Sequence, residues 1–224
     1  MKRCCPWLLL LILATLVPAT SQVPANEDGP QPEVLCLENA FYRLEVDSHF
    51  GRLLRLLDKR GKIDLRCKPE LAANFQLLTS ERLPEVIHGR KQLLSRYQTS
   101  RSRLVLHWDG PLSDDRGAPI DVAATMTVEL EGQSLIFHFH VENRSHSTIA
   151  EVWYPFLGGL LEFGPEETRS EVTLSPPPHQ GKKLRSPLGT HTATYPGQNM
   201  AFLDINNPVV QRGMYFGAHD EIAR

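Results

Sequence analysis

The stretch VAATMTVELEGQSLIFHFHV, residues 122–141, decides the fold class. Apolar and polar residues alternate over 122–130 and again over 135–141, which is the period of a half-buried strand. Between the two runs, Glu131-Gly132-Gln133-Ser134 is typical of a turn. The stretch therefore predicts a long antiparallel hairpin, with Phe137, Phe139 and Val141 on the face that meets the core.

Other segments on both sides of this hairpin also favour strands. Residues 53–57 fit a helix as well as a strand, but they stand between tight turns at 47–51 and 58–61, and so short a helix is marginal. Residues 111–119 are expected to form a polar loop and residues 174–198, rich in proline and glycine, an irregular loop. The remaining predicted strands are 34–37, 41–46, 71–78, 85–95, 101–108, 149–156, 200–205 and 213–218.

These segments predict an all-β, antiparallel β-sandwich. We expect residues 34–170 to form its body, and residues 171–224 to supply the loop and a closing β-hairpin of the same domain.

The first 21 residues have the three parts of a secretory signal peptide. Lys2 and Arg3 give a positive start, residues 8–17 an apolar run, and residues 19–21 a small-residue cleavage site. The chain is therefore expected to be secreted and extracellular, with residues 22–33 as a disordered leader. The alternative is a retained signal that is palmitoylated at Cys4 and Cys5. No later apolar stretch approaches the roughly 20 residues of a spanning helix, so no membrane span is predicted.

Length and charge narrow the function classes. Without residues 1–21 the chain has 203 residues, and losing Lys2 and Arg3 leaves 22 basic against 26 acidic residues, a net charge of −4. A mild negative charge without a basic block argues against nucleic acid as a partner. The sequence contains no P-loop, dinucleotide fingerprint or Gly-x-Ser-x-Gly elbow, so no cofactor is predicted. The sequence sets no oligomeric state.

Two cysteines and one asparagine indicate modifications of a secreted protein. Cys36 and Cys67 remain after signal cleavage and have one possible intramolecular disulfide, the alternative being two buried thiols. Asn143-Arg144-Ser145 is the one N-x-S/T sequon of the chain and follows an apolar strand, which predicts N-glycosylation of Asn143.

Aromatic residues at strand ends are candidate sugar contacts. Trp153 and Tyr154 end the predicted strand 149–156, and Tyr195 lies in the proline-rich loop. Such rings suit the apolar faces of sugars and can also hydrogen bond. The alternatives are core aromatics for the first two and a surface anchor for Tyr195.

Two histidine-containing groups are candidates for chemistry. His219, Asp220 and Glu221 follow an apolar strand and could serve acid–base catalysis, or could simply be solvated strand-end residues. His138 and His140 with Glu142 share a strand face opposite the core face, so we expect them to face solvent or a second layer rather than a metal ion.

Several short motifs, in their order along the chain, resemble a known family. ENAFYRLEV at residues 38–46, followed by Gly51-Arg52-Leu53 and Asp58-Lys59-Arg60-Gly61, resembles the opening hairpin of galactose-mutarotase-like β-supersandwich domains in carbohydrate-active enzymes. Trp153-Tyr154-Pro155 with Gly158-Gly159, Tyr195-Pro196-Gly197, and residues 213–220 are similar to an uncharacterised glycoside-hydrolase-like family.

The resemblance implies a carbohydrate-associated supersandwich domain. In that family the domain precedes a (β/α)₈ barrel that carries the catalytic carboxylates, and this chain ends where the barrel would begin. It therefore implies a secreted module that binds carbohydrate without catalysing a reaction, as a truncated product, a splice form or a fragment of a longer enzyme. The alternative is a glycosidase or sugar mutarotase/epimerase that uses His219 with Asp220 or Glu221.

Overall fold

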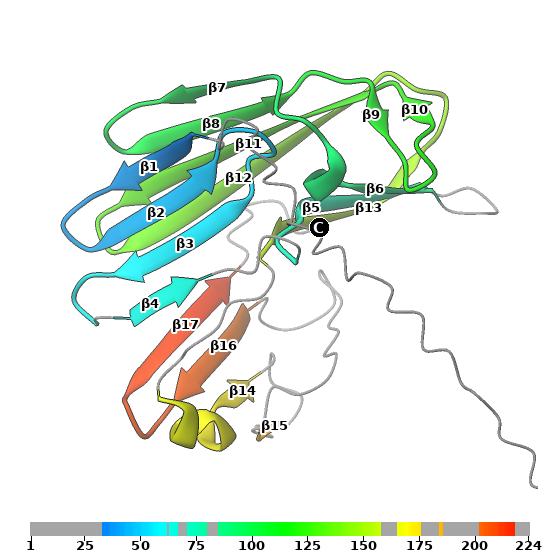
Figure 1. The fold of residues 1–224 in the computed structure, drawn as a ribbon. Coiled ribbons are helices and arrows are strands. Elements are labelled where there is room, and N and C mark those ends of the chain that lie inside the picture. The colour runs from blue at the N-terminus through cyan, green and yellow to red at the C-terminus, as the bar shows by residue number, and fades with distance from the viewer. Residues whose placement is uncertain are drawn as a thin grey trace, which may run out of the picture. The chain divides into compact units, whose positions relative to one another are not determined.

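The computed structural model of the chain is all-β, and its sheets are antiparallel (Figure 1). It describes residues 33–61, 63–66, 71–79, 85–157, 165–175, 184–185 and 202–217. Over these ranges the helical elements are two 3₁₀ helices, η1 (Gly89–Lys91) and η2 (Glu166–Glu171).

The first four-stranded sheet is a meander of consecutive strands. Its order is β1 (Val34–Glu38), β2 (Tyr42–Asp47), β3 (Leu53–Asp58) and β4 (Ile63–Arg66). Leu35, Leu37 and Leu44 point to a buried face, as the alternation predicts, whereas the opposite face carries ion pairs such as Arg55–Asp64. The strand expected at residues 53–57 is confirmed by β3.

The predicted 122–141 hairpin forms the centre of the second four-stranded sheet. β11 (Val122–Glu131) pairs with β12 (Ser134–Asn143) with Leu130 opposite Leu135. β8 (Arg103–Trp108) lies on the other side of β11, and β7 (Arg96–Thr99) forms the edge. Cross-strand neighbours share a face, so the apolar residues of β8 and β11 form one continuous surface.

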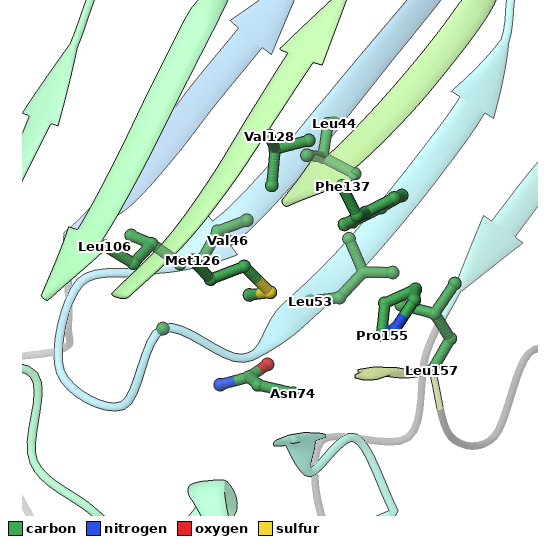
Figure 2. Close-up of a pocket in the computed structure, with 11 residues that line it drawn as sticks. Leu44, Val46, Leu53, Asn74, Leu106, Met126, Val128, Phe137, Pro155 and Leu157 are labelled. Carbon is green, nitrogen blue, oxygen red and sulfur yellow. The ribbon is translucent and has the colours of Figure 1, made fainter. Parts of the chain in front are cut away.

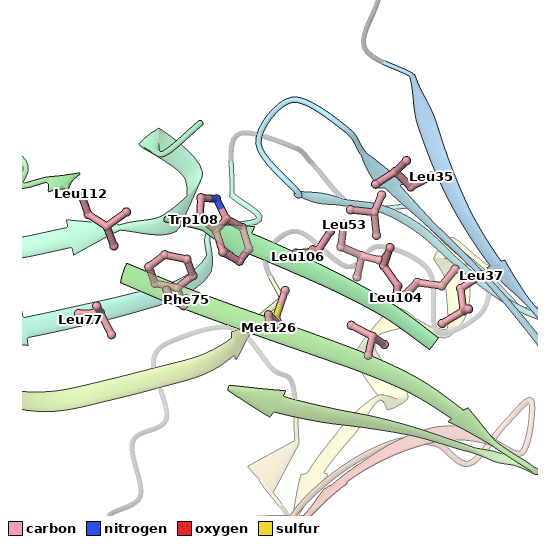
Figure 3. Close-up of a cluster of buried hydrophobic side chains, with 14 of the residues drawn as sticks. Leu35, Leu37, Leu53, Phe75, Leu77, Leu104, Leu106, Trp108, Leu112 and Met126 are labelled. Atoms are coloured by element: carbon pink, nitrogen blue, oxygen red, sulfur yellow. The ribbon is translucent and has the colours of Figure 1, made fainter. Parts of the chain in front are cut away.

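The core lies between these two sheets (Figure 3). Leu104, Leu106 and Trp108 of β8 meet leucines of β1 to β3, and none of these three is more than 1% exposed. Phe75 enters from a third sheet and meets Trp108 edge to face, with ring centroids 5.1 Å apart. The aromatic pair therefore joins the third sheet to the core.

The third sheet, of three strands, positions the candidate site. Its order is β13 (Ile149–Phe156), β5 (Asn74–Thr79) and β6 (Val86–His88). Phe75, Leu77 and Ile87 are fully buried on its inner face, so the alternate residues of β5 and β6 lie on its outer face. Two register shifts interrupt the pairing of β13 with β5.

Several strand predictions needed correction. The strand expected over 85–95 is β6 followed by η1, because Gly89 packs so tightly that a Cβ there would lie 2.3 Å from the Ala73 carbonyl oxygen. The 111–119 loop contains a short pair, β9 (Leu112–Ser113) and β10 (Pro119–Ile120). Strands β4 and β7 were not predicted.

The last sheet has the order β15-β14-β16-β17 and contains the predicted closing hairpin. Its members are β14 (Thr173–Ser175), β15 (Leu184–Arg185), β16 (Phe202–Asn207) and β17 (Arg212–Gly217). β14 and β15 fall in the range expected to be an irregular loop, so that segment supplies two short strands to this sheet.

Candidate functional site

A row of polar and aromatic residues crosses the outer face of the third sheet. Trp153 on β13 pairs with Gln76 on β5, and Gln76 pairs with His88 on β6. Residues directly opposite on neighbouring strands lie on the same face, with Cβ atoms about 4.5–5.5 Å apart. The pairing therefore places an indole, an amide and an imidazole side by side, and we call these three residues the outer row.

Trp153 presents its ring to solvent and is held by a carboxylate. The side chain is 44% exposed, and its indole N–H donates a 2.8 Å hydrogen bond to Oε2 of Glu151. Glu151 precedes Trp153 by two positions and therefore shares its face of the strand. This hydrogen bond restrains an exposed aromatic ring without burying it.

His88, at the other end of the outer row, favours its neutral form. Burial lowers its pKa, the positive charges of Arg90 and Lys91 lower it further, and Asp115 opposes them. A neutral imidazole has one hydrogen-bond donor and one acceptor. The outer row therefore contains a histidine whose neutral form is favoured and no lysine or arginine, and the carboxylate of Glu151 lies beside Trp153.

Tyr154 lies on the opposite side of β13 from Trp153. Its ring stacks on Phe139 of β12, with centroids 5.2 Å apart and planes at 25°. Phe139 in turn lies 4.9 Å from Phe75, so Tyr154 extends the core aromatics while remaining 40% exposed. The two neighbouring aromatics predicted to contact sugar are thus separated by the sheet, and Trp153 is the one beside the outer row.

A small apolar cavity lies between the first and second four-stranded sheets (Figure 2). Leu44, Leu53, Met126 and Phe137 point into it, and Asn74 is a polar residue at its wall. Its volume of about 10 Å³ is about the minimum for a single water molecule. This cavity is therefore too small for a sugar ring.

The histidines of β12 face outward. His138 and His140 are exposed, whereas Phe137 and Phe139, which alternate with them, are half-buried. His138 Nε2 lies 4.0 Å from Oε2 of Glu129. Across the residues that the structure describes, no group of three or more His, Cys, Asp or Glu side chains is arranged to hold a metal ion.

Cys36 carries a free, exposed thiol on the edge strand β1. No disulfide is seen in the described ranges, and Cys67 lies outside them. Cys36 is in register with Glu45, Arg55 and Arg66, so β2 and β3 separate it from the end of β4 by about 14 Å. Disulfide-bonded Cα atoms lie about 4.4–6.8 Å apart. The pairing of Cys36 with Cys67 stays a prediction.

The predicted glycosylation site lies in an exposed turn at the end of β12. Asn143 is exposed, its Nδ2 donates to the Ser147 carbonyl at 2.7 Å, and the Ser145 hydroxyl donates to its Oδ1 at 2.7 Å. The amide and hydroxyl of the sequon are therefore adjacent, on an exposed asparagine and a half-buried serine.

We expect the chain expressed through a secretory pathway to carry one N-glycan, at Asn143. Glycosidase treatment should raise the electrophoretic mobility of the native chain and of Ser145→Thr, because threonine preserves the sequon. Asn143→Gln and Ser145→Ala should show no such change. Unaltered mobility of the native chain would contradict the assignment.

The other sequence candidates lie outside the described residues. They are the signal segment, Cys67, Gly158 and Gly159, Tyr195, and the group His219, Asp220 and Glu221. Their predicted roles stay predictions.

Three further residues on the face of Trp153 were not predicted from the sequence. Glu151 could have been found from the two-residue period of a strand, because it shares the face of Trp153. Gln76 and His88 could not, because their proximity depends on the pairing of β13, β5 and β6, which joins segments more than sixty residues apart.

Neither a scan of protein-family models nor a search of curated proteins finds a match to this chain. Among the described residues, no helix has the length and apolar character needed to cross a membrane.

Proposed function

We propose that this chain is a secreted, carbohydrate-associated β-sandwich module that binds glycans without catalysing their reaction. The observation that carries the proposal is the exposed Trp153 ring, held by Glu151 beside the amide of Gln76 and the imidazole of His88. An aromatic face suits the C–H face of a sugar ring, and the flanking groups suit its hydroxyls.

The proposal includes the finer fold assignment, a galactose-mutarotase-like supersandwich. Antiparallel sheets packed about a common core are consistent with that architecture. The sequence motifs that resemble this family supply the link to carbohydrate. Both the family and the glycan partner therefore belong to the proposal.

The test is affinity electrophoresis of the purified chain in gels that contain soluble polysaccharides. Trp153→Ala should weaken binding about tenfold or more, because the exposed ring supplies the stacking surface and 1.4 kcal/mol corresponds to a factor of ten. Tyr97→Ala is the matched control: Tyr97 is similarly exposed, at 38%, but lies on β7. Equal binding by native chain, Trp153→Ala and Tyr97→Ala would overturn the proposed site.

A further inference from the structure

The charge pattern around Trp153 indicates which sugars its surface selects. Glu151 is exposed and its carboxylate accepts the indole N–H. An ionised carboxylate has about four acceptor positions and no donor, so one indole N–H leaves acceptor capacity beside the ring. Sugar hydroxyls are donors of the type that this capacity requires.

The remaining outer-row groups are uncharged at neutral pH. Gln76 has an amide that both donates and accepts. His88 is mainly neutral, because burial and the nearby cations lower its pKa. A ligand that spans the outer row from Trp153 to His88 therefore meets one negative charge and two neutral polar groups.

Among the described residues, the cations that act on His88 lie beyond the outer row, in η1. Arg90 and Lys91 follow His88. Lys91 Nζ contacts the carbonyl oxygen of Asp115 at 3.3 Å, and Arg90 is half-buried. These cations are the feature that would attract an acidic sugar.

We infer that Glu151 is a specificity-determining residue, which makes the Trp153 surface select uncharged sugars over sugars that carry carboxylate or sulfate groups. This inference rests on the proposed function. Glu151 acts in two ways: it accepts hydroxyl hydrogens in charge-assisted hydrogen bonds, which are stronger than neutral ones, and it repels a ligand anion placed on the indole.

The test compares neutral and anionic polysaccharides in the same affinity gels. The neutral probes are a β-glucan and a galactomannan, and the anionic probes are polygalacturonate and heparin. The native chain should bind a neutral probe at least about tenfold more tightly than either anionic probe. Glu151→Gln keeps an acceptor oxygen for the indole but removes the negative charge. It should therefore weaken binding of the neutral polysaccharides about tenfold and reduce the ratio of neutral to anionic affinity.

Glu142→Gln is the matched control, because Glu142 is an exposed glutamate on another strand, β12. Glu142→Gln should leave the affinities for the neutral and the anionic probes unchanged. If Trp153 is required for binding but the anionic probes bind more tightly, or if Glu151→Gln keeps both affinity and preference, the specificity inference fails while the proposed function stands. If no probe shows binding that depends on Trp153, both fail.

Discussion

Trp108→Ala is expected to lower the free energy of unfolding by about 3–5 kcal/mol, the range measured for removal of large buried aromatic side chains. Trp108 is 0% exposed and lies in the core between the first and second four-stranded sheets. Its ring also meets Phe75 edge to face, a contact that adds to the burial term. The substitution therefore removes both core volume and the link to the third sheet.

Close packing around Trp108 leaves little room for the cavity to collapse. Gly51 has φ = 73°, and a Cβ there would lie 2.9 Å from Cζ2 of Trp108, so the backbone of the β2–β3 turn already touches the ring. The cost of a large-to-small substitution rises with the cavity that remains. We therefore expect Trp108→Ala to lower the free energy of unfolding by an amount within the range of about 3–5 kcal/mol rather than below it.

Two further variants test whether the loss of stability comes from the buried position of Trp108. The free energy of unfolding of each variant is measured by urea unfolding, followed by far-ultraviolet circular dichroism. Trp108→Phe should cost less than Trp108→Ala, because the buried indole nitrogen has no hydrogen-bond partner among the described residues and a phenyl ring fills much of the space. Trp153→Ala removes the same side chain at 44% exposure and should lower stability far less. Equal losses for Trp108→Ala and Trp153→Ala would contradict the assigned core.

The sequence predicted the parts of the fold that local patterns determine. The 122–141 hairpin was predictable because alternation and turn residues agree, and the register pairs Leu130 with Leu135 as that turn requires. β7 was missed because all four of its residues are exposed, so no alternation marks it. The end of β6 depends on the close approach of Gly89 to Ala73, which is a tertiary contact.

The candidate site was predictable only in part, for the same reason. Trp153 was identifiable as an aromatic residue near a strand end, but its separation from Tyr154 follows from the contact of Tyr154 with Phe139. His88 shares a face with Trp153 only through β5, whose Gln76 pairs with both residues. A pattern within one segment carries no information about such cross-strand pairs.

Asp47→Ala is expected to lower the free energy of unfolding by about 3 kcal/mol or more, because it breaks a buried ion pair and leaves its partners unsatisfied. The Asp47 carboxylate is 1% exposed. It accepts hydrogen bonds from the backbone N–H groups of His49, Phe50 and Arg52, at 3.0, 2.6 and 3.1 Å, and from Arg52 Nε at 2.9 Å. The β2–β3 turn is therefore organised around one side chain.

Asp121→Ala provides the matched control for Asp47→Ala. Asp121 also pairs with an arginine, Arg144, at 3.0 Å, but its side chain is 59% exposed. Exposed ion pairs contribute about 0–1 kcal/mol to stability. Asp121→Ala should therefore lower the free energy of unfolding only slightly, and by still less at high salt concentration. The Asp47→Ala loss should persist in salt, because burial protects the pair from screening and the turn loses backbone hydrogen bonds as well. Similar, salt-sensitive losses for both variants would show that Asp47 acts as a surface charge rather than as the acceptor that holds the turn.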